Sequence, residues 1–513
     1  MEQFFATLGG GVGILGDPML WLLLIPGALL GVTVGALPGI GATVAYGLVL
    51  PFTILMEPTS AVAFLLSIAV GNQFGNSIPA ILIGLPGSPA TILTVADGFA
   101  LHKRGETGLA LGIAYIAALG GQAISILFFI ALVVPLSGLT YVFLAPELFS
   151  LYFIGMVSII SLTGKNIPKG IIAATFGLMI GVVGLDPVTL SPRFDFGIRE
   201  LRNGFDPEPV VIGILAVSEL FRQARQSFQW SEISGALVTR FPPFSAIRRC
   251  IPSMIVGTVT GTFVGAIPGA GSAPAAMISY QQSRMMSRHP EEFGKGSIEG
   301  IAANEAAQNA ANSGELIPTL GLGLPVSGTA VLLLSALTIQ GMVPGPSLTR
   351  NSPELLDAAV AGLLGGTIAL LLIGWWLSKA MMQIVRVNRS IVIVVCLAIV
   401  MLGIYAMSRQ ISDVLVCLGF GVIGYFMSRY GYSVAAAGLA AILSAEFERT
   451  LRQGLNLFDN DPLLFFGRPI TATVMVVSLA ILVYGAVRIR RDRRLSGAER
   501  TAAQRDALFG RSE

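Results

Sequence analysis

The chain has 513 residues, of which 54% are hydrophobic and only 12% carry a charge. A soluble domain has about 25% charged residues, so this composition excludes a soluble globular protein and indicates a polytopic membrane protein. The formal net charge of +3 at pH 7 is too small to indicate a nucleic-acid partner. The few lysines and arginines instead bear on the orientation of the chain in the bilayer.

Long stretches without a charged residue predict the membrane segments. A crossing helix needs about 20 apolar residues, and several stretches are long enough for two passes, or for one pass and a re-entrant hairpin. We therefore expect an all-α polytopic membrane protein with roughly 10–14 membrane segments. The charge-free stretches are residues 107–146, 250–283, 316–349, 358–378, 390–408 and 469–487.

The sequence "VGALPGIG", residues 34–41, places helix-breaking residues where a membrane helix would have leucine or valine. Proline removes a backbone donor and glycine permits non-helical conformations. In hydrocarbon such a break survives only where it lines a cavity or is buried in protein, and the helix N-termini at a break attract anions. We interpret Pro38, Gly39 and Gly41 as substrate-binding candidates, with a packing kink as the alternative.

A second broken segment, "GNQFGNSIPAILIGLPGSPAT", occupies residues 71–91. Its three prolines and four glycines favour a re-entrant hairpin over a plain crossing helix. Asp97, just beyond it, is interpreted as a cap or turn residue rather than a ligand. The segment has no charge but offers polar groups, and its substrate-binding candidates are Asn76, Ser77, Gly87, Ser88 and Thr91.

Both motifs recur later in the chain. "VGAIPGAG" at residues 264–271 repeats the first motif at an offset of 230, and "IPTLGLGLPVS" at residues 317–327 matches residues 78–88 at an offset of 239. Two ordered matches indicate an internal duplication. We expect a first repeat with a cytoplasmic linker at residues 1–229, a second repeat with additional C-terminal helices at residues 230–487, and a polar cytoplasmic tail at residues 488–513. The substrate-binding candidates of the second copy are Pro268, Gly269, Gly271, Ser272, Pro325, Ser327 and Gly328.

The charges of the matching loops are reversed between the two halves. In the first half the loop after the Pro-Gly helix has no base and the loop after the second motif is basic; in the second half the order is opposite. Because cytoplasmic loops are enriched in lysine and arginine, we expect two inverted-topology repeats with broken helices and re-entrant hairpins, which are typical of secondary transporters. The bases are Lys103 and Arg104 in the first half, and Arg284, Arg288 and Lys295 against Arg350 alone in the second.

An alanine-rich stretch, "NEAAQNAANSGE" at residues 304–315, carries a polar stripe. Glu305, Asn309 and Asn312 are spaced at i, i+4 and i+7, so they share one face of a helix with Gln308. Amides beside one carboxylate suit a coupling cation, and we interpret these three residues as coupling-ion candidates. The alternative is an exposed helix near the membrane surface.

Residues that would indicate an enzyme are absent from the apolar core. The core has no His-Glu-x-x-His, no paired aspartates and no Cys–His set. We therefore expect no catalytic residue, no metal site and no cofactor other than a coupling cation, Na⁺ or H⁺. The Pro-Gly and Gly-Leu-Pro segments also contain no lysine or arginine, so we expect backbone N–H groups and hydroxyls to hold an anionic substrate.

Taken together, the motifs resemble the large membrane subunit of the tripartite tricarboxylate transporters. Besides the segments above, the resemblance includes "GLDPVTLSPRFDFGIRELRNGF" at residues 184–205, and it extends to about Glu446. The sequence departs from the family pattern at Val326, where glycine is more frequent. Arg193 and Arg199 have no chemical role that we can derive from the sequence, and they could contact a partner subunit.

The resemblance implies a permease that works with a small membrane subunit and a periplasmic solute-binding protein. It implies ion-gradient-driven uptake of a tricarboxylate, a dicarboxylate or a related organic acid across the bacterial inner membrane. The arginine-rich stretch at residues 488–494 places the C-terminus in the cytoplasm. A membrane-embedded enzyme and a passive anion channel are the alternatives.

Overall fold

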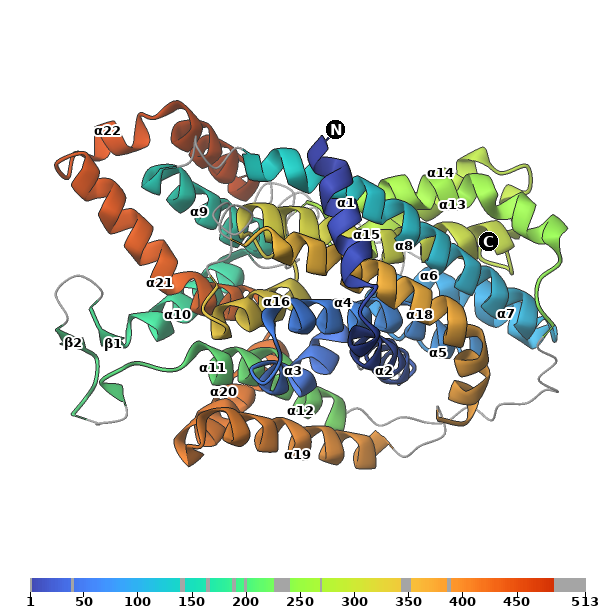
Figure 1. Cartoon of the computed structure of the whole chain (residues 1–513), viewed down its shortest axis with the longest axis horizontal. Helices are drawn as coiled ribbons and strands as arrows, with labels where there is room; N and C mark the ends of the chain where they lie inside the picture. Colours follow the sequence, from blue (N-terminus) through green and yellow to red (C-terminus); the bar gives the residue numbers. More distant parts are fainter. Residues whose placement is uncertain are drawn as a thin grey trace, which may run out of the picture.

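The computed structural model describes residues 2–37, 41–138, 144–162, 167–186, 191–197, 201–225, 240–267, 270–342, 352–384 and 389–483. These residues are almost entirely helical (Figure 1). In the first half the elements are α1 (Glu2–Ile14), α2 (Pro18–Gly35), α3 (Ala42–Thr53), α4 (Pro58–Gly75), α5 (Ser77–Leu82), η1 (Pro89–Thr91), α6 (Ile92–Thr94), η2 (Val95–Phe99), α7 (Ala100–Lys103), α8 (Thr107–Gly138), α9 (Ala145–Leu162), α10 (Ile167–Val182), β1 (Gly184–Leu185), β2 (Pro192–Arg193), α11 (Pro207–Ile212), η5 (Gly213–Val217) and α12 (Ser218–Ala224). In the second half they are α13 (Phe244–Gly265), α14 (Ser272–Met286), η6 (Pro290–Glu292), α15 (Ile298–Leu322), α16 (Gly328–Ile339), α18 (Glu354–Ile384), α19 (Arg389–Ser408), α20 (Ile411–Arg429), α21 (Val434–Leu457) and α22 (Pro462–Phe466).

Six helices in the described part of the chain are long and apolar enough to cross a membrane. Five shorter apolar helices accompany them. The prediction of an all-α polytopic membrane protein is therefore confirmed. The expected number of 10–14 membrane segments stays a prediction, as do the residue boundaries of the two repeats.

Glycines bring corresponding helix pairs of the two halves into backbone contact. A methyl group at Gly31 of α2 would lie 2.2 Å from the carbonyl oxygen of Ile68 in α4. A methyl group at Gly261 of α13 would lie 2.2 Å from the carbonyl oxygen of Ala307 in α15. The two glycines are 230 residues apart, the offset of the Pro-Gly motifs. Each broken hairpin therefore packs on the helix that follows it through the same row of small residues.

The two longest helices pack across the halves. α8, from the first half, lies against α15 and α13, whereas α18, from the second half, lies against α4 and α2 (Figure 1). A methyl group at Gly121 of α8 would be 2.5 Å from the carbonyl oxygen of Ala306, and one at Gly362 of α18 would be 2.7 Å from that of Ala63. Such contacts leave no room for a side chain, so the halves are interlocked through backbone-close packing.

In a second group of helices, segments of the first half again pack on helices of the second half. α10 packs on α21, and α20 packs on the segment formed by α11, η5 and α12. The antiparallel pair β1–β2 projects from this group at one end of the long axis of the molecule, and α7 lies at the opposite end (Figure 1). The β1–β2 pair and α7 thus mark the two ends of the long axis, and the predicted cytoplasmic loops can be placed relative to these ends.

The basic loop of the first half and that of the second half lie together. The guanidinium of Arg104 donates to the carbonyl oxygen of Lys295 at 2.6 Å. The Asp97 carboxylate accepts hydrogen bonds of 2.9 Å from the backbone N–H groups of both Gly296 and Ser297, where α15 begins. Burial raises the pKa of the Asp97 carboxyl above its usual range, and the Ser297 and Gly296 amides oppose this shift. Asp97 therefore caps a helix of the other half, and the two loops share one face of the protein.

Candidate functional site

The two Gly-Leu-Pro segments have the same backbone conformation. Gly84 and Gly323 are both in the left-handed region, with φ of +68° and +71°. Ser88 and Ser327 are both extended, with φ/ψ of −140°/166° and −147°/167°, and each precedes a helical segment. These pairs are 239 residues apart in the sequence. Because a side chain is strained in the left-handed region, the glycines fix where each helix breaks.

Four of the predicted residues stand at the start of helical segments. Gly41 precedes α3, Gly271 precedes α14, Ser88 precedes η1 and Ser327 precedes α16. The first N–H groups of a helix have no partner inside it. No side chain caps α3 or α14, so their first N–H groups can donate to an anion, whereas Ser327 caps α16 by accepting from the Ala330 N–H, and a capping box of Ser88 and Thr91 closes η1. Four further candidates, Pro38, Gly39, Pro268 and Gly269, lie outside the described residues.

Three of these helix starts meet in space. α3 packs on α16, and a methyl group at Gly328 would lie 3.5 Å from the hydroxyl oxygen of Thr43. A methyl group at Gly271 would lie 3.7 Å from one carboxylate oxygen of Glu315, and the other carboxylate oxygen accepts a 2.7 Å hydrogen bond from the Ser327 hydroxyl. The structure thus brings Gly271, Ser327 and Gly328 to one place, which we call the helix-start cluster: the starts of α3, α14 and α16 with Glu315.

The start of η1 is joined to this region through α14, which packs on it. Gly87 lies against the junction of α4 and α5, because a methyl group there would be 2.5 Å from the carbonyl oxygen of Asn76, which joins them. The Asn76 amide donates to the side-chain oxygen of Asn72 at 3.2 Å, and its own side-chain oxygen has no hydrogen-bond partner. Thr91 is fully buried and donates to the carbonyl oxygen of Ser88 at 2.9 Å.

The helix-start cluster contains one negative side chain and no positive one. Residues 41–91, 270–283 and 312–342 include neither lysine nor arginine. Gly41, Gly271, Ser272, Ser327 and Gly328 are partly exposed, and Pro325 is buried behind them. Positive potential must come from the backbone N–H groups, and the Glu315 carboxylate opposes it.

A second polar cluster, the Glu305 cluster, lies deeper in the protein. Both carboxylate oxygens of Glu305 accept hydrogen bonds of 2.5 Å, one from the Thr94 hydroxyl and the other from the Ser77 hydroxyl. The Gln308 amide donates to the same oxygen as Ser77, and the Asn304 amide donates to the Thr94 hydroxyl at 2.7 Å. All five side chains are fully buried. No lysine or arginine in the described part of the chain forms an ion pair with Glu305.

The two clusters are separate sites on one helix, α15. Glu305 and Glu315 are ten residues apart on α15, which corresponds to about 15 Å along its axis. Between them, the Asn309 amide donates to the Glu305 carbonyl oxygen at 2.9 Å and leaves its side-chain oxygen without a partner. Asn312 is 9% exposed, and its side-chain nitrogen has no partner. The buried amide oxygens of Asn304, Gln308 and Asn309 are all unpartnered acceptors.

Comparison with known proteins agrees with this arrangement. A family model described as the tripartite tricarboxylate transporter TctA family matches residues 21–439. The chain belongs to this family. It is 31% identical over 470 residues to an uncharacterized 52.8 kDa protein in the TAR-I ttuC' 3' region of Agrobacterium vitis, a match that covers 91% of this chain and 94% of that protein.

A second relative from Agrobacterium vitis is the uncharacterized protein in the TAR-II ttuC' 3' region. It is 30% identical over 240 residues, which are 45% of this chain and 97% of that protein. No solved structure matches the chain. Membership in a transporter family and the apolar helices together establish a multi-pass membrane protein.

The polar stripe of this TctA-family chain faces the protein interior. Every residue from Ile298 to Gly321 of α15 is buried, so the alternative of an exposed surface helix is wrong. The sequence interpretation did not include Thr43, Thr94 and Glu315 among the candidates. A signal existed only for Glu315, which corresponds to Asn76 at the offset of 239.

The segment at residues 184–205 is attached to the rest of the TctA-family fold by an ion-pair cluster. The Arg193 guanidinium makes two hydrogen bonds to the Glu448 carboxylate of α21, at 2.8 and 3.1 Å, and lies 3.3 Å from Asp186. Arg452 pairs with the same two carboxylates at 3.0 and 2.7 Å. Arg193 therefore holds the β1–β2 hairpin to α21, whereas Arg199 lies outside the described residues.

Proposed function

We propose that this chain is the permease subunit of a binding-protein-dependent tripartite transporter. It carries a tricarboxylate, a dicarboxylate or a related organic acid into the cell by secondary-active transport driven by a gradient of Na⁺ or H⁺. The observation that carries the proposal is the helix-start cluster, where three helix starts without a basic side chain meet at a partly exposed site.

The substrate carboxylate is held by backbone N–H groups and hydroxyls. The free N–H groups where α3 and α14 begin, and those of α16 that Ser327 does not cap, supply a positive potential, and the hydroxyls of Thr43 and Thr329 lie beside them. A buried lysine or arginine would bind the anion more tightly but would cost several kcal/mol in the membrane unless it were paired. A site built from partial charges releases the substrate more readily on the inner side.

Coupling arises from the two carboxylates of α15. An ionised Glu315 repels a substrate carboxylate at the same place, so a proton or a cation on Glu315 favours substrate binding. The Glu305 cluster is the second station, because it combines a buried carboxylate with unpartnered amide oxygens, and oxygen ligands of this kind suit a hard cation. If cation binding favours substrate binding, substrate binding favours cation binding by the same factor, which is the thermodynamic basis of symport.

Alternating access follows from two inverted repeats. The matched glycine contacts at an offset of 230 and the matched serine and glycine conformations at an offset of 239 support the duplication. The contact between the Arg104 loop and the Lys295 loop supports the inversion, because in the inverted topology both loops are cytoplasmic. We assign this face, the linker before residue 240 and the tail at residues 488–513 to the cytoplasm of a bacterium, with the protein in the inner membrane.

The partners are a small membrane subunit and a periplasmic solute-binding protein. The chain then needs no catalytic residue, no metal and no cofactor besides the coupling ion. A membrane-embedded enzyme and a passive anion channel are the competing functions, and no observation favours either. The described residues contain no group of three or more histidine, cysteine, aspartate or glutamate side chains that could hold a metal ion.

Uptake into proteoliposomes separates these functions. The ligand is first identified by mass spectrometry on the cognate binding protein, and its radiolabelled form is then supplied with the assembled complex under an imposed Na⁺ or pH gradient. We expect accumulation above the external concentration that collapses when an ionophore removes the gradient. Equilibration without accumulation would show a channel, and chemical conversion of the substrate would show an enzyme.

A further inference from the structure

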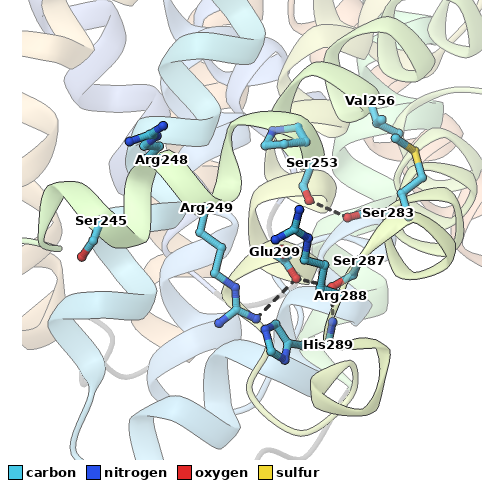
Figure 2. A pocket seen from close by; sticks show the side chains of 12 residues that line it. Ser245, Arg248, Arg249, Ser253, Val256, Ser283, Ser287, Arg288, His289 and Glu299 are labelled. Carbon is cyan, nitrogen blue, oxygen red and sulfur yellow. Dashed lines mark hydrogen bonds and ion pairs between the residues drawn. The ribbon is translucent and has the colours of Figure 1, made fainter.

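A cavity opens between the first turns of α13 and the last turn of α14. It is remote from the helix-start cluster. It has a volume of about 590 Å³, within the range of roughly 300–1,000 Å³ that small-molecule sites occupy. α14 extends 15 residues from its start at Ser272 to Met286, so the cavity is about 20 Å from the Pro-Gly turn. The lining residues are Ser245, Arg248, Arg249, Pro252, Ser253, Val256, Ser283, Met286, Ser287, Arg288, His289 and Glu299 (Figure 2).

Positive side chains dominate this cavity. Three arginines and one glutamate line it. In Figure 2, Arg249, Arg288 and Glu299 lie close to one another, and Arg248 lies apart from them at the edge of the cavity. Arg249 is paired with Glu292 at 2.6 Å and with Glu299 at 3.4 Å. Its buried Nε–H has no hydrogen-bond partner in the described part of the chain. The arginines at positions 248 and 288 remain to attract an anion.

The surface beside the cavity is apolar and faces outward. Ile251, Ile255 and Val259 of α13 are 43%, 52% and 40% exposed. Together with Arg248 they fall on one face of the helix, because their spacing follows the helical repeat. On α14, Met277 and Met285 are 53% and 86% exposed. On α14, however, the exposed residues Gln281, Gln282 and Arg284 lie between these methionines. Only α13 therefore presents an apolar stripe, which begins at Arg248, as expected where acyl chains meet headgroups.

We propose that this cavity binds the phosphate headgroup of an anionic phospholipid, with the acyl chains along the exposed apolar stripe of α13. The headgroup phosphate sits between Arg248 and Arg288, and the hydroxyl of the exposed Ser245 supplies a further donor. Basic pockets between membrane helices on the cytoplasmic side select such lipids. The proposal uses the cytoplasmic orientation of this face from the proposed function, but it depends on neither the substrate nor the coupling ion.

The first half provides a contrast. The corresponding open end of its broken hairpin, at residues 54–57 after α3, carries Glu57 and no base. A lipid anion is therefore bound at one end of the inverted pair only. A lipid fits the cavity better than a free anion, because Arg248 and the exposed apolar residues Ile251 and Ile255 follow one another on the same face of α13.

Native mass spectrometry of the delipidated full-length protein tests this proposal. The probe is phosphatidylglycerol, with phosphatidylcholine as the uncharged comparison, and with glycerol phosphate and inorganic phosphate as headgroups without chains. The test variant is Arg248→Gln/Arg288→Gln. The matched control is Arg284→Gln/Lys295→Gln, which removes two positive charges from exposed side chains that do not line the cavity.

The double variant should bind phosphatidylglycerol about 25-fold more weakly, from about fivefold per arginine, whereas the control should bind like the wild type. Arg248→Lys/Arg288→Lys should keep most of the affinity, because it keeps both charges, and this also shows that the site tolerates substitution. Equal loss in the control would mean general surface charge and would overturn the proposal. Equal affinity for inorganic phosphate or glycerol phosphate would identify a free-anion site and would also overturn it. Transport is measured separately in the proteoliposome assay, so a failure here leaves the proposed function standing.

Discussion

Glu305→Gln is the substitution that most directly probes coupling. It keeps the size of the side chain but removes the charge from a cluster in which Ser77, Thr94 and Gln308 all donate to the carboxylate. The side chain is fully buried and has no cationic partner among the described residues. A negative charge in such a place is costly, and it persists where function requires it.

The stability effect should be small, because two terms of similar size oppose each other. A hydrogen bond to a charged group contributes about 1.5–3 kcal/mol and one to a neutral group about 1 kcal/mol, so the loss over three donors is about 1.5–6 kcal/mol. The desolvation cost of the buried charge, which is also several kcal/mol, disappears. We expect the free energy of unfolding to change by less than about 2 kcal/mol and the protein to stay folded.

The effect on the coupling ion should be large. A unit charge 4 Å from a cation contributes about 4 kcal/mol at an effective dielectric constant of 20, which is about a 1,000-fold change in cation affinity. In proteoliposomes the variant should therefore lose accumulation driven by the gradient. Exchange of labelled for unlabelled substrate without a gradient should continue, since the helix-start cluster is unchanged.

Ser279→Ala is the matched control. Its hydroxyl donates to the Ala303 carbonyl oxygen at 2.8 Å in the buried contact between α14 and α15, and its removal should cost about 1 kcal/mol without affecting coupling. If Glu305→Gln accumulated substrate with the same gradient dependence as the wild type, Glu305 would not be part of the coupling site. If Ser279→Ala lost accumulation as well, the effect would belong to packing of α15.

Three further predictions concern the framework and the helix-start cluster. Gly31→Leu and Gly261→Leu should each lower the free energy of unfolding by about 1–3 kcal/mol or more, because even a methyl group would lie 2.2 Å from a carbonyl oxygen of the neighbouring helix. Gly419→Leu is the control, because no atom lies within 4 Å of a methyl group added there, and it should change stability little. Equal melting temperatures for all three variants would contradict the packing argument. Gly271→Ala should reduce the initial uptake rate, because φ of +64° strains an alanine by about 1–3 kcal/mol; unchanged uptake beside a Gly13→Ala control would remove this position from the site. Arg193→Gln should loosen the β1–β2 hairpin by about 1–2 kcal/mol, since its partly exposed ion pairs are screened by solvent, and faster hydrogen exchange in residues 184–197 would show it. Loss of substrate affinity in this variant, with assembly of the complex intact, would instead make Arg193 a substrate ligand.

Local chemistry made the membrane class and the broken helices predictable. Composition alone indicates the polytopic fold, and proline with glycine in an apolar stretch marks the breaks. The pair Gly84 and Gly323 shows why this works: both have positive φ, which few other residues adopt without strain. The spacing of Glu305 and Asn309 also predicted a shared face of one helix correctly.

The partners across the fold could not be predicted in the same way. Periodicity shows which face of a helix is polar but not which helix covers it. Nothing near Thr94 indicates that its hydroxyl meets Glu305, which is 211 residues away. In the same way, the apolar surfaces of α8 and α18 give no sign that each packs on the other half. For Glu315 the sequence gives only the correspondence to Asn76, because its contacts with Gly271 and Ser327 form only in the folded chain.

The position of both carboxylates on α15 has a mechanical consequence. α15 is in close backbone contact with α13 and α8 through glycines. Such close packing does not allow these helices to slide past one another. α3, α14 and α16 are short segments that begin at the breaks, and the substrate candidates stand at their starts. If the proposed function holds, the coupling-ion sites at Glu305 and Glu315 therefore belong to the rigid part of the molecule. On the same proposal, the anion site lies where that part meets the broken helices, so a change in charge at Glu315 would act on the boundary that alternating access has to move.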